Sequence, residues 1–332
     1  MLLAIVAAAL GFDYPRSVTH PDVSGVNWSD HTSSIKIRSG CSRRECSEAT
    51  SASIPNGPNY KCWGPISLPV SSGKLHRFLP EVDMTLVHHM ILYGGNNCGS
   101  RLIYAWARTG QTSPIGLDFD TWDSSVGFGY PIGYGGITQV SLQIHYQQTS
   151  ATPTVDSSGL RIWYSTEPPR LPLTLNINVL MPDIPAREVS DNCIACRVMR
   201  QGKIYGWRNH AHKLGRDIWS DHFAADGTAK DPVGLISSQH PEIIRKLPEP
   251  KTLLVGEVLQ LHCVYDNSAN SQPSGYGSDE SGEMCNQYLL SDLSLMMRCD
   301  HGGRRRNHTC RDSPHVVDAK GAAQPRKRGA MR

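Results

Sequence analysis

Closely spaced histidines are the residues of this chain best suited to chemistry. His210 and His212 stand two residues apart in the segment "RNHAHKLG". In a β-strand, residues i and i+2 point to the same face, so both imidazoles can reach one metal ion while Ala211 faces away. Imidazole is a ligand for zinc, copper, iron and nickel. The spacing therefore predicts two ligands of a transition-metal site.

Two adjacent histidines, His88 and His89, stand inside the apolar segment "VHHMILY", which otherwise is typical of a buried β-strand. Successive side chains of a regular strand point to opposite faces, so they cannot both reach one ion. Either a β-bulge or a strand end brings the two rings together, or only one is a ligand. His145, in "LQIHYQ", is isolated, and an isolated histidine is ordinarily a hydrogen-bonded core or surface residue.

Met284 precedes Cys285 in the segment "GEMCNQYLL". A methionine in a β-segment usually fills gaps in the core, because its thioether side chain is flexible. If Cys285 forms a disulfide, the same methionine could be held rigidly enough to bind a metal. Because a thioether selects Cu(I), two histidines and a methionine would indicate a copper ion that passes through its reduced state.

Short apolar segments, separated by Gly, Pro, Asn and Ser, carry these residues. They are rich in Val, Ile, Leu, Thr and Tyr, and helical periodicity is nearly absent. We therefore predict an all-β protein of sandwich type, with one short helix at 240–247, "HPEIIRKL". The proline-rich segment 165–173 near the middle of the chain predicts a connection between two domains.

Length and charge exclude few classes of function. With 332 residues the chain can form two ordinary domains or one large one. It has 33 Lys and Arg against 30 Asp and Glu, and many of the basic residues lie at the C-terminus, so no nucleic-acid-binding surface is indicated. Beyond the first residues, no apolar run approaches the roughly 20 residues of a membrane span, which predicts no stable span in the mature chain.

The first residues and the cysteines indicate a secreted protein or one of the secretory-pathway lumen. The segment "MLLAIVAAALGF" is typical of a signal peptide, and sequons at Asn27 and Asn307 fit a glycoprotein. Ten scattered cysteines favour disulfide bonds in an oxidising compartment over a zinc ribbon. The single CxxC, Cys193 and Cys196, has no βαβ pattern around it, so a redox or zinc role is not favoured.

Six ordered motifs resemble one known family. In chain order they are "TLVHHMILYG", "LIYAWAR", "LQIHYQ", "HAHKLG", "HCVYDN" and "DESGEMCNQYLL". They resemble the copper type II, ascorbate-dependent monooxygenases, in particular the branch that acts on peptidylglycine, and the resemblance runs from about Tyr60 to Cys299. The resemblance implies two β-sandwich, jelly-roll-like domains, each carrying one copper site and facing an interdomain cleft.

The apolar first residues, the proline-rich segment 165–173 and the polar composition of the C-terminus divide the chain into four parts. Residues 1–20 would be a signal-like segment and N-terminal arm, and 21–167 the N-terminal copper domain. Residues 168–310 would be the C-terminal copper domain, and 311–332 a disordered basic tail.

The metal ligands are also implied by the resemblance. The ligands of a first copper, which stores and passes an electron, would be His88, His89 and His145. The ligands of a second, where O2 and substrate meet, would be His210, His212 and Met284. Gln143 matches a family position that lies between the two sites.

Substrate residues follow in the same way. The peptidylglycine branch holds the terminal carboxylate of its substrate with an arginine, an asparagine and a tyrosine, which match Arg208, Asn286 and Tyr288. A planar guanidinium can hold a carboxylate with two hydrogen bonds and so place the neighbouring glycine Cα. Without the resemblance, Arg208 would be an ordinary solvated charge at a strand edge.

The implied activity is hydroxylation of the α-carbon of a C-terminal glycine, the first step of peptide C-terminal amidation, with two coppers, O2 and ascorbate. The length of the chain leaves no room for a lyase domain, so a separate lyase would complete the amidation of glycine-extended peptides. The alternatives are a copper monooxygenase of a small amine, similar to dopamine β-monooxygenase, and a non-catalytic copper-binding secreted protein.

The chain departs from the family pattern at several positions. Gly95 stands where the family usually has a cysteine, another family cysteine is missing near Ser157 and Ser158, and Lys213 replaces a common histidine. The disulfides that the resemblance implies are Cys62–Cys98, Cys263–Cys285, and Cys196 with Cys299 or Cys310. The cysteines that it leaves without a partner are Cys41, Cys46 and Cys193.

Overall fold

The computed structural model describes most of the chain between residues 33 and 299. The described ranges are 33–43, 46–47, 50–54, 59–123, 125–147, 154–277 and 281–299. The predicted signal-like segment, both glycosylation sequons and the predicted basic tail lie outside the described residues.

The described part of the chain is built almost entirely of β-strands, which confirms the predicted all-β class. A single 3-10 turn, η1 (Phe119–Thr121), interrupts them within the described ranges. The strands are β1 (Ser34–Arg38), β2 (Ala52–Ile54), β3 (Asn59–Ser67), β4 (Gly73–Glu81), β5 (Val87–Gly94), β6 (Arg101–Ala107), β7 (Leu117–Asp118), β8 (Phe128–Ile132), β9 (Gln139–Tyr146), β10 (Thr154–Asp156), β11 (Gly159–Ser165), β12 (Leu171–Leu180), β13 (Asp183–Ile184), β14 (Val189–Arg200), β15 (Gly202–His210), β16 (Gly215–Phe223), β17 (Ala229–Ser237), β18 (Arg245–Leu253), β19 (Val258–Asp266), β20 (Ser274–Gly275), β21 (Cys285–Asp292) and β22 (Met296–Cys299).

The short helix predicted at 240–247 is wrong. Residues 240–244 form an irregular connection, and strand β18 begins at Arg245. Pro248 and Pro250 explain the difference, because a residue that precedes a proline is pushed toward extended conformations. Strand β18 lies at the end of its sheet, where a proline that cannot donate a hydrogen bond is tolerated.

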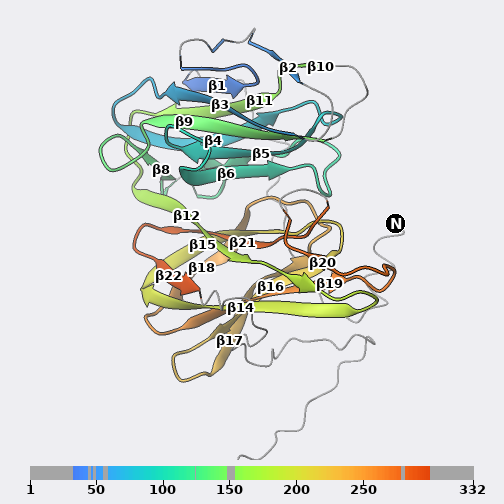
Figure 1. Cartoon of the computed structure of the whole chain (residues 1–332). Coiled ribbons are helices and arrows are strands. Elements are labelled where there is room, and N and C mark those ends of the chain that lie inside the picture. The colour runs from blue at the N-terminus through green and yellow to red at the C-terminus, as the bar shows by residue number, and fades with distance from the viewer. Residues whose placement is uncertain are drawn as a thin grey trace, which may run out of the picture.

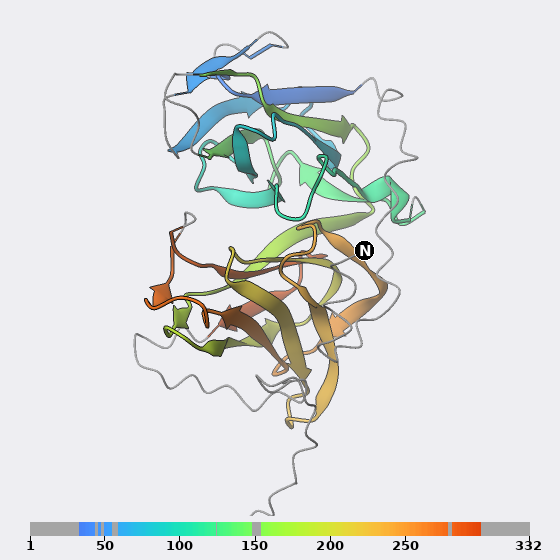
Figure 2. The same cartoon turned by 90° about the vertical axis from the view of Figure 1, so that its right-hand side faces the viewer.

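The strands form two stacks, one above the other in Figure 1 and again in the turned view of Figure 2. The upper stack contains the four-stranded sheet β3-β9-β5-β6, and the lower one the five-stranded sheet β17-β16-β19-β14-β22. A longer sheet, in the order β1-β11-β4-β8-β12-β21-β15-β18, passes from one stack to the other because β12 pairs with both β8 and β21. The chain crosses between the stacks at 166–170, within the proline-rich segment, and the division into two domains stays a prediction.

The apolar core explains which side chains are left for a site. On β9, Val140, Leu142 and Ile144 are fully buried in the core of the upper stack. Because side chains alternate along a strand, Gln143 and His145 project from the other face of this sheet. The same apolar cluster continues into the lower stack through residues of β12, β15 and β21, namely Leu173, Leu175, Tyr205, Tyr288 and Leu290. The two stacks therefore pack directly against each other.

Disulfide bonds join several of these strands. The predicted pairs Cys62–Cys98 and Cys263–Cys285 are confirmed, and of the two alternatives for Cys196 the structure has Cys196–Cys299. Cys41 and Cys46, which the sequence left without partners, pair with each other, and Cys193 is also disulfide-bonded. Since Cys196 pairs with Cys299, the CxxC is not a redox pair.

His262, in the lower stack, lies between two carboxylates. Its Nδ1 is 2.8 Å from Asp191 Oδ2, its Nε2 is 3.3 Å from Asp221 Oδ2, and its ring stacks on Trp219. Burial lowers the pKa of His262, but the hydrogen bonds and charges of Asp191 and Asp221 outweigh it and raise the pKa to about 9. His262 is therefore a buried imidazolium at neutral pH.

This ion pairing predicts a pH-dependent stability. Because the folded-state pKa of His262 lies above the unfolded value of about 6.5, its contribution is fully present below pH 6.5 and is lost as the pH rises through about 9. We expect His262→Gln to cost about 3 kcal/mol more unfolding free energy at pH 6 than at pH 10, as measured by urea denaturation of both proteins. An equal cost at the two pH values would contradict the assignment.

Candidate metal centres

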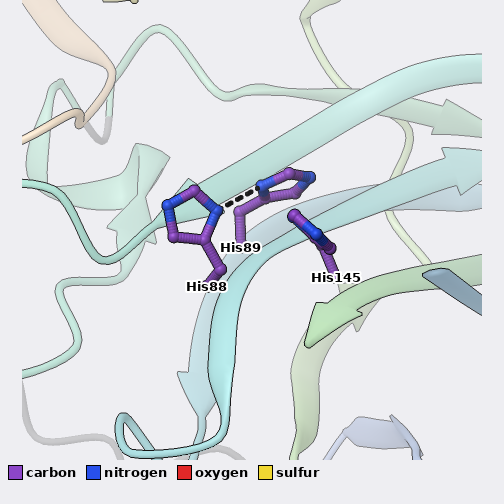
Figure 3. A group of neighbouring side chains, drawn as sticks. All are labelled: His88, His89 and His145. Atoms are coloured by element: carbon purple, nitrogen blue, oxygen red, sulfur yellow. Dashed lines mark hydrogen bonds between the residues drawn. The ribbon is translucent and has the colours of Figure 1, made fainter. Parts of the chain in front are cut away.

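The first candidate centre is a cluster of three imidazoles, His88, His89 and His145, shown in Figure 3. One ring nitrogen from each lies within 4.8 Å of the others. His89 stands opposite His145 in the register of β5 and β9, and their ring centroids are 4.7 Å apart. The structure therefore brings together the three histidines that the sequence predicted as one ligand set.

A β-bulge solves the problem of two adjacent histidines. The register of β5 against β9 shifts between Val87 and His89, so His88 does not follow the regular pleat. As a result, the Nδ1 atoms of His88 and His89 lie only 3.2 Å apart. Of the alternatives left open by the sequence, the structure has the bulge, and both rings face the same point.

The surroundings of this cluster favour the form of histidine that binds metal. Burial lowers the pKa of His89 well below its usual value, and the charges of His145 and His88 lower it further. A neutral imidazole is the form that coordinates a metal ion, so protons do not compete at His89 near pH 7. Tyr60 stacks on His145, with ring centroids 4.0 Å apart. No local sequence pattern indicates this contact, since it is made between β3 and β9.

The second candidate pair stands at the end of β15. His210 is the last residue of this strand and His212 lies just beyond it, with ring centroids 5.2 Å apart. The Nδ1 of His212 is 2.8 Å from the carbonyl oxygen of Gly282, and its Nε2 is buried without a hydrogen-bond partner among the described residues. Burial and the neighbouring His210 lower the pKa of His212. His212 thus presents a neutral ring with its Nε2 left for a metal ion.

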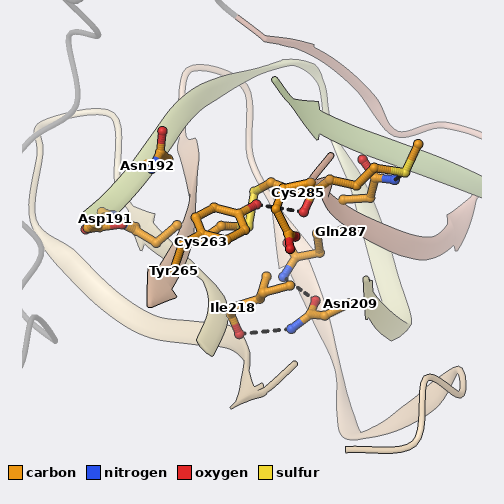
Figure 4. The surroundings of a disulfide bond; sticks show 12 residues. Asp191, Asn192, Asn209, Ile218, Cys263, Tyr265, Cys285 and Gln287 are labelled. Atoms are coloured by element: carbon orange, nitrogen blue, oxygen red, sulfur yellow. Dashed lines mark hydrogen bonds and ion pairs between the residues drawn. A yellow bond between two sulfur atoms is a disulfide. The ribbon is translucent and has the colours of Figure 1, made fainter. Parts of the chain in front are cut away.

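Met284 lies in a segment that is tied to the same pair. The carboxylate of Glu283 accepts hydrogen bonds from the backbone N–H of His212 and of Leu214. On the other side, the Tyr265 hydroxyl donates to the carbonyl oxygen of Met284, beside the Cys263–Cys285 disulfide seen in Figure 4. The methionine is therefore held from both sides, as the sequence suggested, and its role as a ligand stays a prediction.

The predicted substrate residues share a face of one sheet. In the register of β15 and β21, Arg208 stands opposite Tyr288 and His210 opposite Asn286. The guanidinium carbon of Arg208 lies 4.8 Å from the centre of the Tyr288 ring. Arg208 is only 3% exposed, which excludes a solvated charge at a strand edge. The structure thus gathers these residues beside the second candidate centre.

Glu242 is the site residue that the sequence did not reveal, because its segment was assigned to a helix. Its Oε2 accepts a hydrogen bond from Arg208 Nη2 at 2.7 Å and lies 2.7 Å from His210 Nδ1. Burial alone would raise the pKa of Glu242, but His210 and Arg208 hold it below its usual value, so the carboxylate is ionised. A carboxylate on Nδ1 orients a histidine and leaves Nε2 for a metal.

One residue of each candidate centre lines a cavity of about 210 Å³. His88 of the first centre and His212 of the second both line it, and so does Lys213, the residue that replaces a common histidine of the family. The charges of His210 and Arg208 also contribute to the lowered pKa of His89, as expected of groups that lie near one another.

The donor set fits a copper ion at each centre. The first centre offers three imidazoles, and the second offers two whose Nδ1 atoms are engaged by Glu242 and by Gly282. Imidazole suits copper in both oxidation states, and a thioether adds a preference for Cu(I). Gln143 is on the same face of β9 as His145, and its role between the sites stays a prediction.

Comparison with known proteins gives a consistent picture. Residues 177–305 match the family model of the copper type II ascorbate-dependent monooxygenase C-terminal domain. Peptidyl-glycine alpha-amidating monooxygenase of Mus musculus is 28% identical over 238 residues, which is 64% of this chain and 23% of that protein. Dopamine beta-hydroxylase of Rattus norvegicus is 29% identical over 181 residues, 48% of this chain and 28% of that protein. The chain thus matches about a quarter of the length of these curated relatives.

The second centre predicts a specific role for the sulfur of Met284. Met284→Ile removes the soft donor and keeps most of the volume, so we expect the fold to be retained. Cu(I) affinity should fall at least about tenfold, since even residues that only orient a ligand change metal affinity roughly 10–100-fold. Competition with a Cu(I) chelator measures this, with the exposed Met181→Ile as the matched control. Unchanged Cu(I) affinity would show that Met284 only packs.

Proposed function

Because this chain belongs to the copper type II ascorbate-dependent monooxygenase family, we propose that it hydroxylates the α-carbon of a C-terminal glycine in peptides. In this reaction one atom of O2 enters the C–H bond and the other leaves as water, while ascorbate supplies two electrons and two protons. The observation that carries the proposal is that Arg208, Asn286 and Tyr288 lie together beside His210.

The residues of the candidate site have separate roles in the proposed reaction. The first copper would be held by His88, His89 and His145, and the second by His210, His212 and Met284. Copper bound there would supply the one-electron steps that the reduction of O2 requires. The Nη1 of Arg208 is buried and has no hydrogen-bond partner in the described part of the chain, so it can donate to a substrate carboxylate. Tyr288, beneath the guanidinium, holds Arg208 in place.

One cavity reaches both centres through His88 and His212. The exposed residues Lys213 and Gln239 also line it, so the cavity is open to solvent. Gln143, on the face that carries His145, is positioned to contact molecules between the centres.

A hydroxylase of a small amine is the second candidate. It is favoured by the Glu242 carboxylate, which already neutralises Arg208, and by the similarity to dopamine beta-hydroxylase. The third alternative, a non-catalytic copper-binding protein, would need the same six ligand residues, so their presence in the chain does not distinguish it from an enzyme.

The disulfide bonds indicate the compartment in which the protein would act. Disulfide bonds such as Cys62–Cys98 and Cys263–Cys285 form and persist in oxidising compartments, which supports a secreted protein or one of the secretory-pathway lumen. Among the described residues, no helix is long enough and apolar enough to cross a membrane. The hydroxyglycine product would pass to a separate lyase that completes the amidation.

Mass spectrometry tests the proposed activity. A glycine-extended peptide incubated with enzyme, copper and ascorbate should gain one oxygen atom, and the same peptide ending in proline, which lacks a glycine Cα, should not. A metal chelator should abolish the gain. No change in the peptide, together with oxygen insertion into phenethylamine, would replace this proposal with the second candidate.

A further inference from the structure

Glu242 occupies one edge of the Arg208 guanidinium. Arg208 Nε donates to the carbonyl oxygen of Glu242 at 3.0 Å, and Nη2 donates to its carboxylate at 2.7 Å. A guanidinium holds a carboxylate through two parallel N–H groups, so this edge is not available to a substrate. The end of the guanidinium that carries Nη1 remains available, because Nη1 is buried and has no hydrogen-bond partner among the described residues.

Glu242 also cancels the charge of Arg208. The side chains of Arg208 and Glu242 are only 3% and 1% exposed, so water screens the pair weakly. A substrate carboxylate at Arg208 would therefore meet a neutralised cation and a second carboxylate at close range. Like charges brought together without water between them cost binding free energy, which weakens the attraction that a free arginine would provide.

Two further contacts prevent Glu242 from moving aside. Its carboxylate oxygens lie 2.7 and 2.9 Å from His210 Nδ1, so moving away would leave a buried N–H without an acceptor. The backbone that carries Glu242 is held by Arg245, whose Nη1 donates to the carbonyl oxygens of Pro241 and Ile243. Arg245 is another buried cation near Arg208, and its Nη1 holds the backbone on both sides of Glu242. The Arg245 guanidinium itself lies over the ring of Trp207.

We propose that Glu242 is a specificity-determining residue, which weakens the grip of Arg208 on a substrate carboxylate. The site then takes peptides with an uncharged terminal group about as well as peptides that end in a free carboxylate. This inference rests on the proposed function, since it assumes that the end of a peptide binds at Arg208. It names the substrate class more closely, as one whose end need not be an anion.

Binding measurements on the copper-loaded protein without ascorbate test this inference independently of turnover. Two peptides would be titrated by calorimetry, identical except that one ends in glycine and the other in glycinamide. In the wild type, the two dissociation constants should agree within about tenfold. Glu242→Gln removes the charge and can still accept a hydrogen bond from His210, so the glycine peptide should bind about tenfold tighter and the glycinamide peptide unchanged.

Two control variants test whether the change in peptide affinity acts through Arg208. Glu257→Gln removes another buried carboxylate that contacts a histidine, His222, but that has no contact with Arg208. It should leave the affinity for both peptides unchanged. Adding Arg208→Ala to Glu242→Gln should abolish the gain for the glycine peptide, because the guanidinium freed by the first change is then gone.

The outcomes separate this inference from the proposed function. A wild-type preference for the glycine peptide above about tenfold would support peptide hydroxylation and overturn the role of Glu242, even if Glu242→Gln did not fold. Equal gains for both peptides in Glu242→Gln would also overturn it. Failure of both peptides to bind, in the wild type and in the variant, would reject the peptide substrate and this inference together.

Discussion

The candidate site depends on the contact between two buried sheet faces. Apolar side chains of β12, β15 and β21 join the core of the upper stack, and Arg101 Nη2 donates across the contact to the carbonyl oxygen of Leu173. The contact brings His89 and His145 of the upper stack near Arg208 and His210 of the lower stack. Without this packing, the two groups of histidines would not line one cavity.

Burying so many polar groups has a cost, which shapes the site. A buried charge is destabilising unless it is paired, and Glu242 meets this requirement for Arg208 while it orients His210. Glu283 accepts hydrogen bonds from the backbone N–H groups of His212 and Leu214, so these buried donors are satisfied. Among the buried atoms without a hydrogen-bond partner in the described residues, His212 Nε2 and Arg208 Nη1 are two that the proposed function would use for metal and substrate. The hydrogen bonds of Glu242 and Glu283 thus stabilise the buried groups and also orient the residues of the candidate site.

Local spacing in the sequence predicted the all-β class and the H-x-H pair, because alternation along a strand is a short-range property. At His88 and His89 it left a bulge, a strand end or a single ligand as alternatives, and the structure has the bulge. The two clearest disulfides followed from the family resemblance. Glu242 and the stacking of Tyr60 on His145 could not be found in this way, since each depends on segments that meet only in the folded chain. The helix predicted at 240–247 failed because the prolines that follow favour extended backbone.

Copper stoichiometry tests the central claim most directly, since the account requires two separate centres on one chain. The purified protein would be loaded with copper, dialysed and analysed for metal and protein. We expect two coppers per chain in the wild type and one in His145→Ala, whose second centre is left intact. One copper or none in the wild type, or loss of both in His145→Ala with the fold retained, would contradict the account.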